Sequence, residues 1–141
     1  MTTHALIQYL EMFKDFNNGN TLENIVLQHG KFYNPPTFAP RPKHIVKGRD
    51  KHCFDNSYHI AIQNKGYTYV EGIAVSLIPL HHAWVLDENG IVIETTWQDA
   101  GSGYYGIAFD FKFIHQVFLD TKTYGVIDLT SPTFRKRFEI K

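Results

Sequence analysis

The sequence predicts an α+β fold in which helices precede an antiparallel sheet. The 141 residues include eleven Phe and eight Tyr, a composition that favours sheet over a bundle rich in Leu and Ala. Apolar residues follow mainly helical spacing in the first half of the chain, and period-two alternation begins at Tyr67. Helices followed by a run of strands are typical of the α+β class. The length favours one domain, residues 1–141, with a single core.

Two helices are expected in the first third of the chain. The stretch "HALIQYLEMFKDF" (4–16) carries Leu6, Leu10 and Phe13 at helical spacing, and "NNGN" ends it. A shorter helix is expected from Thr21 to Gln28. Four prolines between residues 35 and 42 exclude a helix or a central strand. We expect this segment to run extended over the surface.

A central helix is expected in "DKHCFDNSYHIAIQNKG" (50–66). Phe54, Tyr58 and Ala61 lie on one stripe, and Gly66 marks the stop. Asp50 is a possible N-cap because its carboxylate can accept hydrogen bonds from the first backbone N–H groups.

The second half of the chain is expected to form the sheet. "YTYVEGIAVSLI" (67–78) alternates as a strand does, and "HHAWVLDENGIVIETTW" (81–97) has the pattern of a hairpin. "GSGYYG" (101–106) is expected to be a loop. "IAFDFKFIHQVFLD" (107–120) is interpreted as a strand followed by a helix, and "TYGVIDLT" (123–130) as a last edge strand.

The charge balance and the N-terminal residues argue against a nucleic-acid-binding, secreted or membrane-spanning protein. Lys+Arg and Asp+Glu both number 14, whereas a nucleic-acid-binding domain usually has a basic excess. The short run Arg135–Arg137 is interpreted as a solvated end. The N-terminus has no basic n-region, and its apolar residues are interrupted by polar ones, so neither a signal peptide nor a membrane span is expected. We expect a cytoplasmic protein whose thiol stays reduced.

The only cysteine, Cys53, falls in the first turn of the expected central helix. Unpaired N–H groups and the helix dipole favour a thiolate there. The same N–H groups can stabilise an oxyanion. A thiol nucleophile also needs a base nearby, and the hairpin offers His82 together with Glu94.

The register of the hairpin decides whether His82 and Glu94 can meet. A two-residue turn at Asn89-Gly90 would pair Glu88 with Ile91 and put the imidazole and the carboxylate on opposite faces. A three-residue turn that ends at Gly90 would pair Asp87 with Ile91. His82 and Glu94 then become diagonal neighbours on one face, within reach of each other. A catalytic role therefore requires the three-residue turn.

The order of these residues resembles the transglutaminase-like branch of the papain-like superfamily. The matching positions are Cys53 at a helix start, "HAWV" from His82 to Val85 and "ETTW" from Glu94 to Trp97, within about residues 50–109. The resemblance implies a papain-like fold, with the cysteine-bearing helix packed on an antiparallel sheet. The same stretch of sequence also resembles small uncharacterised bacterial and phage-type proteins of that branch.

The resemblance implies a Cys53–His82–Glu94 triad that acts on a protein or peptide-like amide, without metal or organic cofactor. Cys53 would be the nucleophile, His82 the general base and acid, and Glu94 the orienting residue. The family usually has Asp at the acid position and often Gln shortly before the Cys, whereas this chain has Glu94 and "VKGRDKHC" without Gln. Four aromatic residues are expected to contact substrate: Trp97, Tyr104, Tyr105 and Tyr69.

Two alternatives stay open. The first is a zinc site, since Cys53, His59, His81 and His82 are residue types that zinc accepts. Adjacent strand residues point to opposite faces, however, so only one of the paired histidines could contribute. The second is a catalytically inactive papain-like domain that binds a protein partner. Glu71 interrupts an apolar strand, either as a buried partner of a Lys or His or as a second acid of the site.

Overall fold

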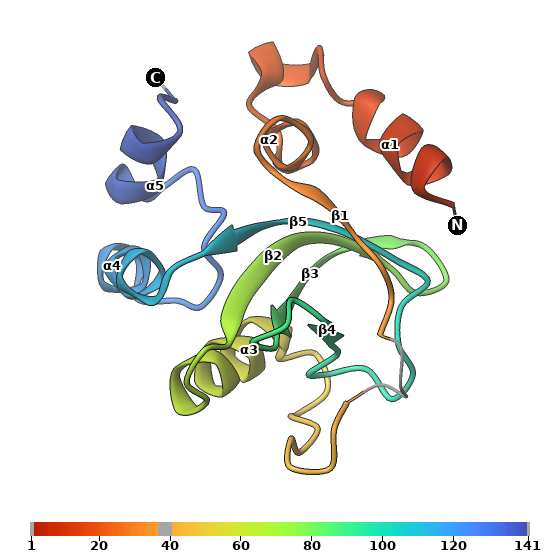
Figure 1. Ribbon diagram of the computed structural model, residues 1–141. Coiled ribbons are helices and arrows are strands. Elements are labelled where there is room, and N and C mark those ends of the chain that lie inside the picture. Colours follow the sequence, from red (N-terminus) through yellow and green to blue (C-terminus); the bar gives the residue numbers. More distant parts are fainter. Residues whose placement is uncertain (1, 37–40, 141) are drawn as a thin grey trace.

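A computed structural model describes residues 2–36 and 41–140 and has an α+β architecture built on one curled antiparallel sheet (Figure 1). The five strands follow the order β1-β5-β2-β3-β4. Their bounds are β1 (Lys31–Tyr33), β2 (Thr68–Val75), β3 (Pro79–Leu86), β4 (Val92–Ile93) and β5 (Gly103–Phe109). The helices are α1 (Thr3–Glu11), α2 (Leu22–His29), α3 (Cys53–Gln63), α4 (Phe111–Thr121) and α5 (Pro132–Arg137), with a 3-10 turn η1 (Phe16–Gly19).

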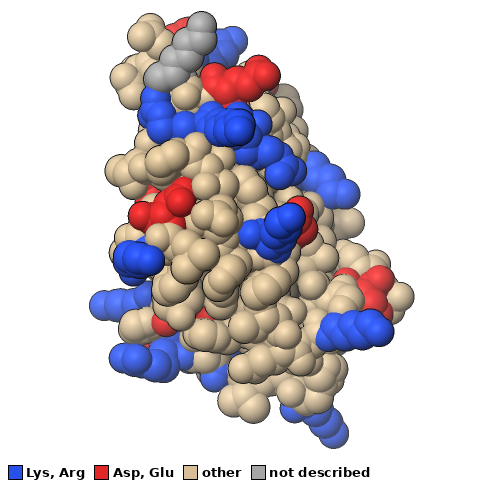
Figure 2. All heavy atoms as spheres, turned by 90° about the vertical axis from the view of Figure 1, so that its left-hand side faces the viewer, with Lys and Arg blue, Asp and Glu red and all other residues tan. Residues whose placement is uncertain are grey.

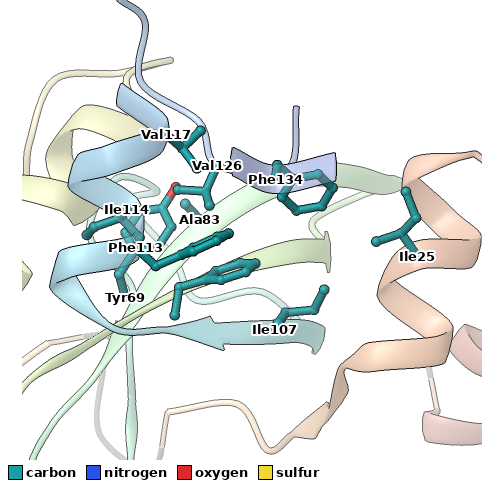
Figure 3. Packing of buried hydrophobic residues seen from close by; sticks show 10 residues of the cluster. Ile25, Tyr69, Ala83, Ile107, Phe113, Ile114, Val117, Val126 and Phe134 are labelled. Carbon is teal, nitrogen blue, oxygen red and sulfur yellow. The ribbon is translucent and has the colours of Figure 1, made fainter. Parts of the chain in front are cut away.

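Alternation along the strands gives the sheet two differently covered faces. One face meets the helices: Tyr69, Ala83 and Ile107 pack there against side chains from α2, α4 and α5 (Figure 3). Ile73 and Val75 continue this face beneath α1 and α2. The other face has its own aromatic core, formed by Tyr33, Val70, Ala74, Trp84, Leu86, Val92 and Tyr104.

The helix that carries Cys53 lies across the middle strands. Ile60 and Ala61 of α3 pack against Val85 and Ile93, and Phe54 and Tyr58 reach the cluster on the helix-covered face. The start of α3 is therefore fixed against β3, the strand that bears both histidines of the hairpin.

Several predicted elements are confirmed. The helix expected at 21–28 is α2, whose N-cap Thr21 accepts a hydrogen bond from Asn24 N–H at 3.1 Å. The strand at 67–78 is β2, and the hairpin is β3 and β4. The predicted change from strand to helix occurs at Asp110, which caps α4 by accepting from Phe113 N–H at 2.8 Å.

Other predictions are wrong at the ends of elements. The first helix stops at Glu11 rather than Phe16, because the N–H groups of residues 12–14 bond to carbonyls three residues back, at 3.2–3.3 Å, instead of four. The N-cap of α3 is His52 rather than Asp50. Asp50 instead pairs with Lys47 at 2.6 Å. Of the proline-rich segment, residues 37–40 lie outside the described residues, and residues 35–36 and 41–42 are neither helix nor strand.

The largest corrections concern glycine-rich and C-terminal stretches. "GSGYYG" is not a loop, because from Gly103 onward it belongs to β5. Gly106 is needed in that strand since a Cβ there would lie 2.8 Å from the Trp84 ring. "TYGVIDLT" is not a strand but the connection from α4 to α5. The basic run at 135–137 lies in α5, and Lys136 and Arg137 are exposed there, as expected of a solvated end. Strand β1 had no distinct signal in its three residues.

The basic residues of α5 partly serve the fold. Arg135 donates to the Leu129 carbonyl at 3.2 Å, and the Arg137 guanidinium lies 5.0 Å from the Phe113 ring centre. Figure 2 shows that acidic and basic side chains are interspersed over the side of the molecule that includes α4 and α5. In the described part of the chain, no helix combines the length and the apolar character needed to cross a bilayer.

Candidate active site

The hairpin has the register that a catalytic role requires. Val85 pairs with Ile93 and Leu86 with Val92, and the Asp87 N–H donates to the Ile91 carbonyl at 3.0 Å. Gly90, at φ +78°, occupies the left-handed position at the end of the turn. The three-residue turn is confirmed, and it brings the side chains of His82 and Glu94 to one face.

His82 and Glu94 form a buried pair. The imidazole Nε2 lies 2.9 Å from Oε1 and 3.1 Å from Oε2 of the carboxylate. The Trp97 indole stacks on the imidazole, with ring centres 3.8 Å apart and 13° between their planes. The His82 side chain is only 2% exposed, so this hydrogen-bonded pair is shielded from solvent and held in one orientation.

The Glu94 carboxylate has a full set of donors. Oε2 accepts from the backbone N–H groups of Thr96 and Trp97, both at 2.9 Å, and Oε1 accepts from the Tyr104 hydroxyl at 2.9 Å. Burial opposes ionisation, but the hydrogen bond and charge of His82 together with these backbone donors hold the pKa of Glu94 below its ordinary value. An ionised carboxylate only accepts hydrogen bonds, so Nε2 of His82 must carry the proton between them.

Cys53 lies at the start of α3, as expected, but as a buried thiol. The first N–H groups of any helix have no carbonyl acceptor within it, and His52 supplies no side-chain cap to these groups in α3. One of them, at Phe54, forms a hydrogen bond with the Cys53 sulfur. The backbone of Ala83, the residue after His82, contributes a hydrogen bond to the sulfur. The thiol therefore lies against the stretch of β3 that bears the imidazole.

Burial reverses the expected direction of the thiol pKa. Cys53 is 8% exposed, and desolvation, followed by the charges of Glu71 and Glu94, raises its pKa to about 11 against the opposing backbone hydrogen bonds. In the described residues, no hydrogen bond joins the sulfur to either histidine, and Nδ1 of His82 has no partner. The expected lowering of the thiol pKa is therefore wrong for this resting conformation.

A second histidine–carboxylate pair lies on the helix-covered face. His81 Nε2 is 2.8 Å from Glu71 Oε2, and the carboxylate also accepts from the Tyr69 hydroxyl and from the N–H groups of Val126 and Ile127 at 2.7 and 3.0 Å. Of the two roles expected for Glu71, this contact supports the buried partner of a histidine. The pair ties β2 and β3 to the α4–α5 connection.

The four aromatic residues expected to contact substrate lie in different places. Trp97 lies directly on the imidazole. Tyr104 is buried behind the pair, where its hydroxyl serves Glu94, and Tyr69 serves Glu71. Tyr105 is on the helix-covered face, near α2, with its hydroxyl 3.5 Å from the Leu27 carbonyl. The structure thus brings Trp97 and Tyr104 to the pair and leaves Tyr69 and Tyr105 elsewhere.

Arg41 supports the site and had no sequence signal of its own. Its guanidinium donates to the carbonyl of Glu94 at 3.0 Å and to that of Trp97 at 3.2 Å. It therefore holds the segment after β4 that carries both residues. An isolated arginine inside a proline-rich stretch gives no indication of such a contact.

A surface depression opens beside the pair. Trp97 forms part of its wall, and the loop before Cys53 and the β2–β3 turn form other parts. The lining residues are Asp50, Lys51, Ser76, Thr96, Trp97, Gln98 and Asp99. Since Trp97 also stacks on His82, the depression reaches the residue that covers the buried imidazole.

Comparison of the chain with known protein families, curated proteins and solved structures finds no significant match. Within residues 2–36 and 41–140, no three His, Cys, Asp or Glu side chains gather where they could hold a metal ion. The papain-like resemblance therefore remains a prediction, and the chemistry of the site has to be inferred from its geometry.

Proposed function

We propose that this protein catalyses thiol-dependent acyl transfer at an amide bond, with Cys53 as nucleophile and the His82–Glu94 pair as acid–base partner. The observation that carries the proposal is the buried His82–Glu94 pair, in which four hydrogen-bond donors fix the carboxylate. His82 lies on β3, and the backbone of the same strand forms a hydrogen bond with the Cys53 thiol. A carboxylate that fixes the tautomer of an imidazole leaves the other ring nitrogen free as a base. The fold proposed with this activity is papain-like.

The first half of the reaction forms a thioester. The Cys53 thiol passes its proton to Nδ1 of His82 as the sulfur bonds to the amide carbonyl carbon. The N–H groups in the first turn of α3 are suited to stabilise the oxyanion. The C–N bond then breaks, and the Nδ1–H of the imidazolium supplies the proton to the leaving amine. Glu94 stabilises the imidazolium through Nε2–H throughout.

The second half releases the acyl group. Water, or a second amine, attacks the thioester carbonyl and gives a proton to Nδ1. The C–S bond breaks, and the imidazolium returns its proton to the thiolate. The products are a carboxylic acid or a new amide, and the enzyme is regenerated without a change of oxidation state or a cofactor.

The proposal is tested by the pH dependence of iodoacetamide alkylation at Cys53, compared between the wild type and His82→Ala. We expect the wild type to be alkylated at neutral pH despite the raised pKa of the resting thiol, because the imidazole can take the thiol proton as the sulfur reacts. In His82→Ala alkylation should require direct ionisation of the thiol and be slow at every pH below 10. Circular dichroism of both proteins controls for folding.

The alternative function, a protein-binding domain without catalysis, is favoured by one observation. The thiol is buried and its pKa is raised to about 11, which is a resting state of low reactivity. If alkylation is slow at every pH below 10 and identical in His82→Ala, the acyl-transfer proposal is wrong, and the binding function becomes the better interpretation.

A further inference from the structure

The turn between β2 and β3 exposes an unusual amount of apolar surface beside the depression. Leu77 is 97% exposed and Ile78 is 60% exposed. The turn is ordered, because the Ser76 N–H donates to the Ile78 carbonyl at 3.2 Å. Large aliphatic side chains that point into solvent do not pack in the core. A ligand that covers them removes apolar surface from water, which is favourable.

This apolar turn is continuous with the proposed active site. Ser76, which begins it, lines the same depression as Trp97. On β3, alternation puts Leu80 on the same face as His82, two residues nearer the turn. Leu80 is itself partly exposed. Leu77, Ile78 and Leu80 do not line the depression themselves, but the exposed turn borders it at Ser76.

From these observations we infer that the turn formed by Leu77 and Ile78 is a specificity surface that binds an apolar side chain of the amide substrate. The inference rests on the proposed function, because it treats the depression as the substrate site. The distance between His82 and Ile78 sets the position of the apolar side chain along the substrate. His82 lies three strand residues from Pro79, the first residue of β3, and Ile78 immediately precedes Pro79, a separation of ~10–13 Å that an extended peptide spans in about four residues. The preferred substrate thus carries a large aliphatic residue about four positions from the reacting amide.

The depression itself is lined mainly by polar side chains. Lys51 and Asp99 line it, and neither forms an ion pair within the described residues. A peptide that binds here can keep polar groups on this side while its aliphatic side chain meets the turn. One amphipathic, extended peptide fits both the polar depression and the apolar turn beside it. A ligand with charges of one sign would instead meet the opposite charges of Lys51 and Asp99 and the apolar surface of the turn.

The test is equilibrium peptide binding to the Cys53→Ser protein, followed by backbone amide NMR, so that no chemistry is needed. The probes are blocked nine-residue Ser/Gly peptides with a single leucine moved through the sequence. We expect saturable shifts at Leu77, Ile78 and Trp97 that depend on leucine. The Leu77→Ser/Ile78→Ser double variant should bind the best peptide about tenfold more weakly.

A matched control separates this effect from a general loss of apolar surface. Val46 is also highly exposed but lies outside the β2–β3 turn, so Val46→Ser should leave binding unchanged. Equal binding of leucine-containing and leucine-free peptides, or an unchanged affinity in the double variant, would overturn the inference. Neither result depends on the alkylation of Cys53, so the failure of this inference can be distinguished from failure of the proposed function.

Discussion

At the scale of single residues, the site depends on how a buried carboxylate is satisfied. Glu94 accepts hydrogen bonds from two backbone N–H groups, an imidazole and the Tyr104 hydroxyl. An unpaired buried charge would be strongly destabilising, and a buried polar group without a partner costs ~1–3 kcal/mol. Four donors let the carboxylate stay ionised without access to water, and only an ionised carboxylate fixes the imidazole tautomer that the proposed reaction needs.

We predict that Tyr104→Phe lowers the free energy of unfolding by ~1–2 kcal/mol, because Glu94 loses one donor and the Gly101 N–H loses the hydroxyl that accepts from it at 2.7 Å. The adjacent Tyr105→Phe is the control, since that hydroxyl makes one long contact of 3.5 Å, and its effect should stay within ~0.5 kcal/mol. Urea denaturation measures both values. Equal effects of the two variants would show that the Tyr104 hydroxyl contributes nothing specific.

At the scale of elements, the β3–β4 turn decides whether the site exists. A shift of one residue in a strand register moves every side chain to the other face, which would separate Glu94 from His82. Gly90 permits the three-residue turn because it adopts φ +78°. A Cβ at this position would meet no atom within 4 Å, so a substitution here changes backbone preference without any steric clash.

We predict that Gly90→Ala destabilises the protein by ~1 kcal/mol, because alanine disfavours the left-handed conformation. Gly90→Asn should lose less, since asparagine tolerates this region better. Thermal unfolding ranks the three proteins, and the His82 ring resonances report whether the pair survives. An alanine variant as stable as the wild type would mean that another turn of equal energy is available and that Gly90 does not fix the register.

At the scale of the whole molecule, two buried carboxylates link stability to pH. Burial opposes the ionisation of Glu71 and Glu94, yet their histidine partners and backbone donors hold both pKa values below the ordinary one. The unfolded chain therefore binds protons at a pH where the native protein still does not. Stability rises with pH in that window, and the contribution is lost as the pH falls through the native pKa values.

We predict that the free energy of unfolding is nearly constant above pH 5 and falls steeply below ~4.3, the ordinary glutamate pKa. Urea denaturation at intervals between pH 3 and 7 measures this. Glu94→Gln, which cannot ionise at this position, should start less stable and show a shallower fall. A wild-type profile that stays flat down to pH 3 would contradict the assignment of depressed pKa values to the two carboxylates.

Patterns in the sequence determined much of this structure. Period-two alternation and the helix stripe predicted β2, the hairpin and α3, because those signals come from residues that bury one face. The sequence also indicated His82 and Glu94 as the candidate pair, and hairpin geometry predicted that they meet only with the three-residue turn that ends at Gly90. The short strand β1 was missed because three residues carry no period, and the first part of β5, residues 103–106, was missed because glycines there serve close packing rather than turns.

Only the tertiary structure decided how the site is completed. The contacts of Arg41 and Tyr104 with the Glu94 segment join residues far apart along the chain or in different strands, and no local pattern encodes them. The state of the thiol was decided the same way. The position of Cys53 at a helix start favours a thiolate, but packing against β3 removes water and raises the pKa of the thiol to about 11. Desolvation is a property of the assembled core, so a local motif could not predict its direction.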